Sequence, residues 1–148
     1  MKTIIIYDSV YGNTKEIALA ISKELKGKLI HVNDVKINEI NNYDLLIIGT
    51  PTHAAMPTKD IQDFLSNLPK LNIKFATFST GIYSKDKNFF LKILIKILGY
   101  ASIKMSRQLK KKGYVEIIKN KDFLVFDKKG PLLKKEIDKA IYWVKSIN

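Results

Sequence analysis

The sequence contains no cysteine and only two histidines, His31 and His53. Without cysteine the chain has no disulfide bond, no thiol nucleophile and no iron–sulfur ligation. Two histidines are too few for a His-based metal centre without help from carboxylates, so we predict no metal site. The loops also lack a pair of acid and base side chains, and the sequence therefore predicts no catalytic residue.

Long hydrophobic runs are also absent, since no apolar stretch reaches the ~18 residues that a membrane-spanning helix needs. The chain begins with a strand-like segment and shows no signal peptide, which leads us to expect a cytoplasmic protein. A hydrophobic content of 46% excludes a disordered chain. The 148 residues suit a single domain, which we expect to cover residues 1–148.

Acidic residues are scarce in the second half of the chain, and the net charge is +12. Residues 1–74 hold nine basic and eight acidic side chains, whereas residues 75–148 hold seventeen basic and six acidic ones. The basic half could face an acidic protein or an anionic membrane, or could simply form a solvated surface. We expect no binding to nucleic acid, because the lysines are not interleaved with aromatic residues on one surface.

Hydrophobic periodicity predicts strands that alternate with helices. Such alternation is typical of an α/β fold with a parallel sheet and helices on both faces. Thr58 is a candidate cap for the second helix. The predicted strands are residues 2–7, 28–32, 45–49, 75–79, 114–118 and 123–126, and the predicted helices are residues 14–26, 59–68, 88–98, 101–112 and 132–147.

Three loops, at residues 8–13, 50–57 and 80–86, each follow a predicted strand. In a parallel sheet the ligand lies beyond the carboxyl ends of the strands, so these loops are expected to meet at one edge. Their convergence predicts a binding site there.

The first loop has the composition of a phosphate site. Ser9 and Thr14 supply hydroxyls, Gly12 lets the backbone fold closely, and a helix N-terminus follows. The loop lacks both the lysine of a nucleotidase P-loop and a three-glycine dinucleotide fingerprint. It therefore favours a terminal phosphate monoester, the alternative being an ordinary turn with a capping threonine.

The other two loops suit a flat ligand. Small residues surround His53, whose ring can stack on another ring or donate a hydrogen bond, although a solvated histidine is the simpler interpretation. In the third loop Gly81 permits a close approach, and Tyr83 offers either an aromatic wall or a lid on the sheet.

Three segments resemble the flavodoxin family: the phosphate loop Ser9-Val10-Tyr11-Gly12-Asn13-Thr14, the second loop Gly49-Thr50-Pro51-Thr52-His53, and the tail from Phe123 to Leu132. The resemblance implies a flavodoxin-like three-layer sandwich whose five-stranded parallel sheet has the order 2-1-3-4-5. It also implies FMN as the cofactor and electron transfer through the flavin ring.

The resemblance further implies which residues contact FMN. Four residues, Ser9, Gly12, Asn13 and Thr14, would hold the phosphate, while Thr52 and His53 would flank the ring. The complete predicted cofactor-binding set is Ser9, Val10, Tyr11, Gly12, Asn13, Thr14, Pro51, Thr52, His53, Ala54, Ala55, Thr80, Gly81 and Tyr83.

Two residues and the charge depart from the family pattern. Tyr11 replaces a Thr or Ser, and Ala54 replaces a Gly whose peptide can turn toward the flavin. A positive φ costs alanine about 1 kcal/mol, so we expect the one-electron-reduced flavin to be less stabilised than in a homologue with Gly. Familiar flavodoxins are acidic, whereas this chain is basic, which predicts an acidic redox partner.

An apolar helical insertion at residues 88–99 is a further departure. It could cover the flavin, form a dimer contact, pack as core, or rest on a membrane with Lys92, Lys96 and Lys104 toward lipid phosphates. It loosely resembles the apolar and basic insert of flavodoxin-like protoporphyrinogen oxidases.

Three functions remain open. We favour an FMN-binding electron carrier that shuttles electrons between redox partner proteins. The alternative is a quinone- or NAD(P)H-linked oxidoreductase that contacts a membrane or substrate through residues 88–99. The third is a flavin-free interaction module that binds through its basic half.

Overall fold

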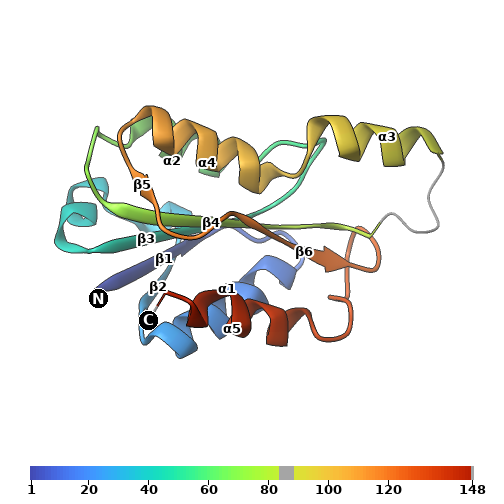
Figure 1. The fold of residues 1–148 in the computed structure, drawn as a ribbon, viewed down its shortest axis with the longest axis horizontal. Helices are drawn as coiled ribbons and strands as arrows, with labels where there is room; N and C mark the ends of the chain where they lie inside the picture. Colours follow the sequence, from blue (N-terminus) through green and yellow to red (C-terminus); the bar gives the residue numbers. More distant parts are fainter. Residues whose placement is uncertain (84–88, 148) are drawn as a thin grey trace.

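The computed structural model describes residues 1–83 and 89–147, apart from the side chains of Leu91 and Lys96. A parallel sheet with the order β2-β1-β3-β4-β5 lies at its centre, and β6 also pairs with β4 (Figure 1). The predicted order 2-1-3-4-5 is confirmed, with a sixth strand added. The strands are β1 (Thr3–Tyr7), β2 (Lys28–His31), β3 (Leu45–Pro51), β4 (Lys74–Ile82), β5 (Val115–Glu116) and β6 (Lys121–Val125).

Helices cover both faces of the sheet, which makes three layers (Figure 1). The strands β1 and β3 are rich in Ile and Leu because both of their faces are buried. On one face Ile4 and Ile48 belong to a core that includes α2 and α4, and on the other Ile5 and Ile47 belong to a core that includes α1 and α5. The helices are α1 (Asn13–Leu25), α2 (Lys59–Asn67), α3 (Phe89–Leu98), α4 (Ala101–Lys111) and α5 (Glu136–Lys145), and two 3₁₀ helices span Val32–Asp34 and Ile37–Asn42.

The end of β4 differs from the prediction. Thr80 and Gly81, expected in a loop, continue the strand because β6 pairs alongside them, with Thr80 opposite Phe123 and Gly81 opposite Leu124. Residues 84–86 of the predicted loop lie outside the described residues. The carboxyl edge of the sheet therefore extends farther on this side than the hydrophobic pattern suggested.

Helix α2 begins at Lys59 as predicted but without the expected side-chain cap, whereas α5 begins later than predicted. Thr58 occupies the N-cap position of α2, but its buried hydroxyl has no hydrogen-bond partner within the described residues, and its N–H donates to Thr50 Oγ1 at 3.1 Å. The last helix begins at Glu136 rather than residue 132, because residues 131–133 pair with the end of β6, where the N–H of Leu133 donates to Leu124 O at 2.9 Å. The Glu136 carboxylate also accepts from the N–H of Leu124 at 3.0 Å.

The predicted insertion forms α3, which projects beyond the sheet (Figure 1). Residue 88, where the prediction began, lies outside the described residues. Phe89 and Phe90 are 78% and 71% exposed, so the interpretation of α3 as packed core is wrong for these side chains. No described helix combines the length and the apolar character needed to cross a membrane.

Candidate functional site

A cleft of about 210 Å³ opens at the carboxyl edge of the sheet, where the three predicted loops meet. Eleven of the predicted site residues line it, whereas Gly12, Ala55 and Tyr83 do not. Within the described residues, no three His, Asp or Glu side chains are grouped to hold a metal ion. The predicted residues that line the cleft are Ser9, Val10, Tyr11, Asn13, Thr14, Pro51, Thr52, His53, Ala54, Thr80 and Gly81.

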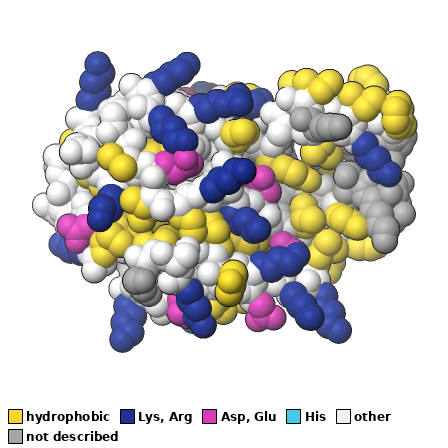
Figure 2. Space-filling view, viewed as in Figure 1, with side chains coloured by type: hydrophobic (Ala, Val, Ile, Leu, Met, Phe, Trp, Pro, Cys, Tyr) yellow, Lys and Arg dark blue, Asp and Glu magenta, His cyan; other side chains and the backbone are white. Residues whose placement is uncertain are grey.

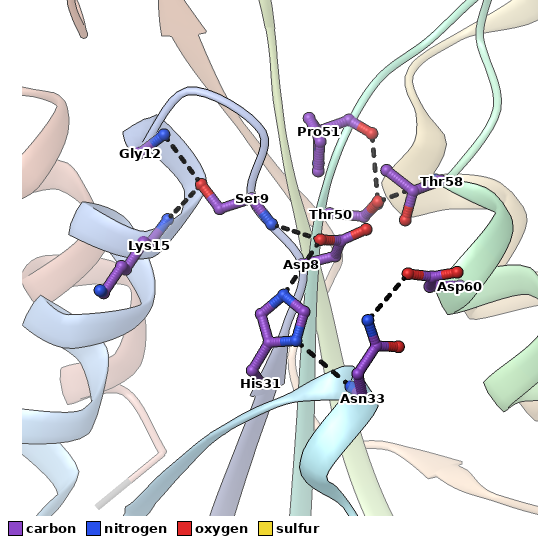
Figure 3. Close-up of polar contacts among 10 residues, drawn as sticks. All are labelled: Asp8, Ser9, Gly12, Lys15, His31, Asn33, Thr50, Pro51, Thr58 and Asp60. Carbon is purple, nitrogen blue, oxygen red and sulfur yellow. Dashed lines mark hydrogen bonds and ion pairs between the residues drawn. The ribbon is translucent and has the colours of Figure 1, made fainter.

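The first loop is held in shape by its own polar groups (Figure 3). Ser9 Oγ accepts hydrogen bonds from the N–H groups of Gly12 and Lys15, both at 3.2 Å. Asp8 Oδ1 accepts from the N–H of Ser9 at 2.7 Å and lies 3.3 Å from His31 Nε2. These bonds hold the first loop in a compact shape against the first turn of α1.

The backbone N–H groups at the N-terminus of α1 belong to residues that line the cleft beside the first loop. Gly12 is the N-cap residue, and its φ of 94° is a conformation that glycine adopts without strain. The N–H groups of Asn13 and Thr14 donate to no protein acceptor within the described residues. Such free donors, at the positive end of the helix dipole, suit an anion.

Hydrogen bonds between the loops fix the width of the cleft. The buried hydroxyls of Thr14 and Thr80 lie 2.7 Å apart, and the N–H of Thr52 donates to Thr80 O at 2.8 Å. Asn13 Nδ2 donates to Lys129 O at 3.2 Å. The side chains of Asn13 and Thr14 thus join protein segments, and their backbone N–H groups remain for a ligand.

The second loop contains a tight turn with two strained alanines. His53 and Met56 exchange both backbone hydrogen bonds, at 2.9 and 2.8 Å, and the residues between them are Ala54, with φ 46°, and Ala55, with φ 64°. This two-residue turn is usually built with Asn and Gly because both central residues need positive φ. The conformation that the resemblance assigns to a glycine is therefore already adopted by Ala54.

The side-chain ring of Tyr100 packs directly against Gly81. A Cβ placed on Gly81 would lie 2.2 Å from the ring of Tyr100. Burial, with a smaller contribution from Asp122, raises the pKa of the Tyr100 hydroxyl. Gly81 thus lines the cleft and also admits Tyr100 against the strand, a packing role that sequence reasoning missed.

A half-buried carboxyl, that of Asp122, is linked to the second loop through Ser79. Asp122 Oδ1 accepts hydrogen bonds from the hydroxyls of Ser79 at 2.6 Å and Ser102 at 2.5 Å, and Thr52 Oγ1 donates to Ser79 Oγ at 3.3 Å. Burial raises the pKa of Asp122, although both serine hydroxyls and Lys121 oppose the shift. Sequence reasoning missed this residue, because nothing in the pattern distinguishes it from an exposed turn aspartate.

Three further residues line the cleft without having been predicted, namely Ile82, Val125 and Lys128. Lys128 brings to the cleft the cation that the first loop lacks. Lys128 lies within the 123–132 tail, which resembles the flavodoxin family. Its position in that segment was the signal that could have identified it. The fold, rather than local spacing, joins the tail to the first loop through Asn13 and Lys129.

The chain is similar to known proteins over most of its length. A family model described as a flavodoxin domain matches residues 4–110. An uncharacterised protein of Methanocaldococcus jannaschii is 32% identical over 115 residues, which cover 77% of each chain. Probable flavodoxin 1 of Bacillus subtilis is 31% identical over 96 residues, which cover 58% of this chain and 60% of that protein.

Solved structures agree on the fold. A flavodoxin from the domain Archaea superposes with a TM-score of 0.70 at 19% identity and covers 99% of both chains. The family match spans most of the chain and includes the first two loops of the cleft. The chain therefore belongs to the flavodoxin family.

Proposed function

We propose that this protein binds FMN in the cleft and carries electrons between redox partners. The observation that supports this most strongly is that the N–H groups of Asn13 and Thr14, which have no acceptor within the described residues, lie in the same cleft as His53 and Ala54 of the 53–56 turn. A phosphate monoester suits these N–H groups, and a flat ring suits the part of the cleft next to the 53–56 turn.

The donor set matches the terminal phosphate of FMN. The N–H groups of Asn13 and Thr14 would donate to it, and Lys128 would add a positive charge from the 123–132 tail, which Asn13 contacts through Lys129 O. Gly12 allows the backbone to turn toward this group, and Ser9 keeps the loop closed. When bound, FMN supplies one- or two-electron transfer.

The remaining cleft residues would position the ring. We assign the two sides of the ring to Tyr11 and His53, which are exposed aromatic residues that line the cleft. Pro51, Thr52 and Ala54 would contact one ring edge through a backbone that hydrogen bonds hold in place. The other proposed contacts are Val10, Ala55, Thr80, Gly81 and Tyr83, of which Ala55 and Tyr83 would need to approach from outside the present cleft.

Charge suggests the kind of redox partner. The net charge of +12 favours an acidic protein, and the absence of cysteine fits a role in the cytoplasm. Association with such a partner should slow as ionic strength rises, since screening weakens electrostatic steering.

Flavin loading tests the proposal. The purified chain is mixed with FMN, passed through a desalting column and examined by absorbance and flavin fluorescence. We expect retained flavin with quenched fluorescence, and reversible bleaching when dithionite and then air are added. A chain that retains no flavin would instead favour the flavin-free interaction module.

A second candidate is a quinone- or NAD(P)H-linked oxidoreductase. A second pocket of about 250 Å³ shares Thr52, Ala54, Gly81 and Ile82 with the cleft. Its remaining lining is mostly apolar and comes half from α3 and half from Ala55, Gly99 and Tyr100. A small flat substrate there would lie beside the ring end of the cleft. Rapid oxidation of NAD(P)H or a quinol by the flavin-loaded protein alone would favour this candidate, and slow oxidation would favour the carrier.

A further inference from the structure

Exposed hydrophobic side chains are concentrated at the cleft end of the molecule. Of the fifteen large hydrophobic side chains that are exposed among the described residues, eleven lie in α3 or just after strands β1, β3, β4 and β6. We call these eleven the apolar end: Val10, Tyr11, Met56, Tyr83, Phe89, Phe90, Ile93, Leu94, Ile97, Leu98 and Phe126.

Helix α3 contributes the largest part of the apolar end. Its exposed residues follow two rows with a spacing of four, 89-93-97 and 90-94-98, which together form one broad stripe. Phe89 and Ile97 are more than 70% exposed, and Figure 2 shows hydrophobic side chains gathered where α3 projects. Leu94, Ile95 and Leu98 also line the second pocket, so the most exposed part of the stripe is formed by residues 89, 90 and 97.

The charges around this end are mostly positive. Lys92 is exposed on α3, Lys104 lies on α4 with its Nζ 3.1 Å from Met56 Sδ, and Lys128 lines the cleft. Of the acidic residues nearby, Asp8 is paired with His31, and Asp127 is exposed. Because each chain carries +12, a second copy docked on this face would meet strong like-charge repulsion.

We propose that the apolar end docks on the surface of an anionic lipid bilayer. Helix α3 lies in the headgroup region, with its apolar stripe toward the acyl chains and Lys92 toward lipid phosphates. Its ten residues span about 15 Å, a length that suits lying in the interface. Docking brings the mouth of the cleft to the membrane and depends on no bound cofactor, so it goes beyond the proposed electron carrier.

Sedimentation with lipid vesicles tests the docking. The full chain is mixed with vesicles of phosphatidylcholine alone or phosphatidylcholine with phosphatidylglycerol, with and without FMN. We expect pelleting with the anionic vesicles at low salt, weaker pelleting at high salt, and little with the neutral ones. No pelleting with anionic vesicles, or equal pelleting with both kinds, would overturn the proposal.

Matched variants locate the contact. Phe90→Ser combined with Ile97→Ser should weaken vesicle binding by about tenfold or more, since both changes remove apolar side-chain surface that the bilayer would bury. Tyr142→Ser is the control, because Tyr142 is 81% exposed but lies on α5. Circular dichroism checks that each variant is folded, and equal losses in the double variant and the control would contradict a role for α3.

Charge variants separate lipid from other occupants. Lys92→Gln should weaken binding to anionic vesicles about fivefold, whereas Lys23→Gln, at the far end of α1, should not. Analytical ultracentrifugation tests the competing occupant, a second copy. A concentration-dependent dimer that the α3 double variant abolishes would overturn bilayer docking in favour of self-association.

Discussion

At the scale of single residues, Lys128 carries the sharpest prediction about ligand chemistry. It lines the cleft, whereas its neighbour Lys129 is also exposed but does not. Lys128→Gln should weaken FMN binding about two- to fivefold, because an exposed charge pair contributes up to ~1 kcal/mol. Fluorescence titration checks this, with Lys129→Gln as the matched control and riboflavin as the ligand without phosphate.

FMN and riboflavin differ only in the phosphate, so comparing their affinities tests where Lys128 acts on the ligand. Lys128→Gln should leave the affinity for riboflavin unchanged if the lysine acts on the phosphate. Equal weakening of FMN and riboflavin binding would place Lys128 elsewhere along the ligand.

The two alanines of the 53–56 turn store backbone strain. A left-handed conformation costs an L-residue about 1–2 kcal/mol, and glycine removes that cost while adding ~0.5–1 kcal/mol of unfolded-state entropy. Ala55→Gly should therefore raise the free energy of unfolding by roughly 0.5–1 kcal/mol, measured by urea denaturation.

The control for this change is Ala20→Gly in the interior of α1. It should lower the free energy of unfolding by about 1 kcal/mol, because glycine is a poor helix former. If Ala55→Gly also destabilised the protein, the positive φ at position 55 would not be a source of strain.

Asp122 gives a prediction about pH. Its folded pKa is raised above the ordinary value of 3.8, so ionisation at neutral pH costs stability, and this cost disappears as pH falls toward 3.8. Asp122→Asn should be more stable than the unmodified protein at pH 7, and the difference should shrink on acidification. Denaturation at several pH values checks this, and a difference that is constant or grows at low pH would contradict it.

At the scale of the elements, β4 and α4 are connected through Gly81 and Tyr100. A Cβ on Gly81 would overlap the Tyr100 ring, so Gly81→Ala should cost about 1–3 kcal/mol of folding stability. In a Tyr100→Ala background the same change should cost much less, because the overlapping ring is gone. A double-mutant cycle measures this coupling, and purely additive losses would show that the ring is not the cause.

The succession of strands and helices along the chain could be predicted because these elements carry local hydrophobic patterns. The aliphatic runs of β1 and β3 and the spacing of Ile17 and Ile21 in α1 are local signals. The end of β4 could not be predicted, since Thr80 and Gly81 are extended through pairing with a strand more than forty residues away. Long-range pairing leaves no local pattern.

The same distinction holds within the cleft. Ser9 and Thr14 could be predicted as lining residues because they lie close together in the sequence, around the loop that follows β1. Lys128 and Asp122 could not, because tertiary contacts bring Lys128 to the cleft and partly bury Asp122. Nor could the side-chain bond from Asn13 to Lys129 be inferred, since it joins residues that are 116 positions apart.

At the scale of the whole molecule, α3 lies at the edge of the three-layer fold where β4 ends (Figure 1). The cleft and the apolar end are formed by residues from this same edge. The basic charge is distributed mainly over the second half of the chain, which includes α3, α4 and the tail with Lys128. A bound FMN would thus lie where exposed apolar side chains and lysines meet. Both an acidic partner and an anionic membrane would approach from this side.

The central claim is that the cleft recognises FMN through its phosphate at the N-terminus of α1. Calorimetric titration of the flavin-free chain with FMN and with riboflavin tests it most directly. We predict one FMN per chain, bound about tenfold or more tightly than riboflavin, since each charge-assisted hydrogen bond contributes ~1.5–3 kcal/mol. Equal affinity for both ligands, or no binding of FMN, would contradict the claim.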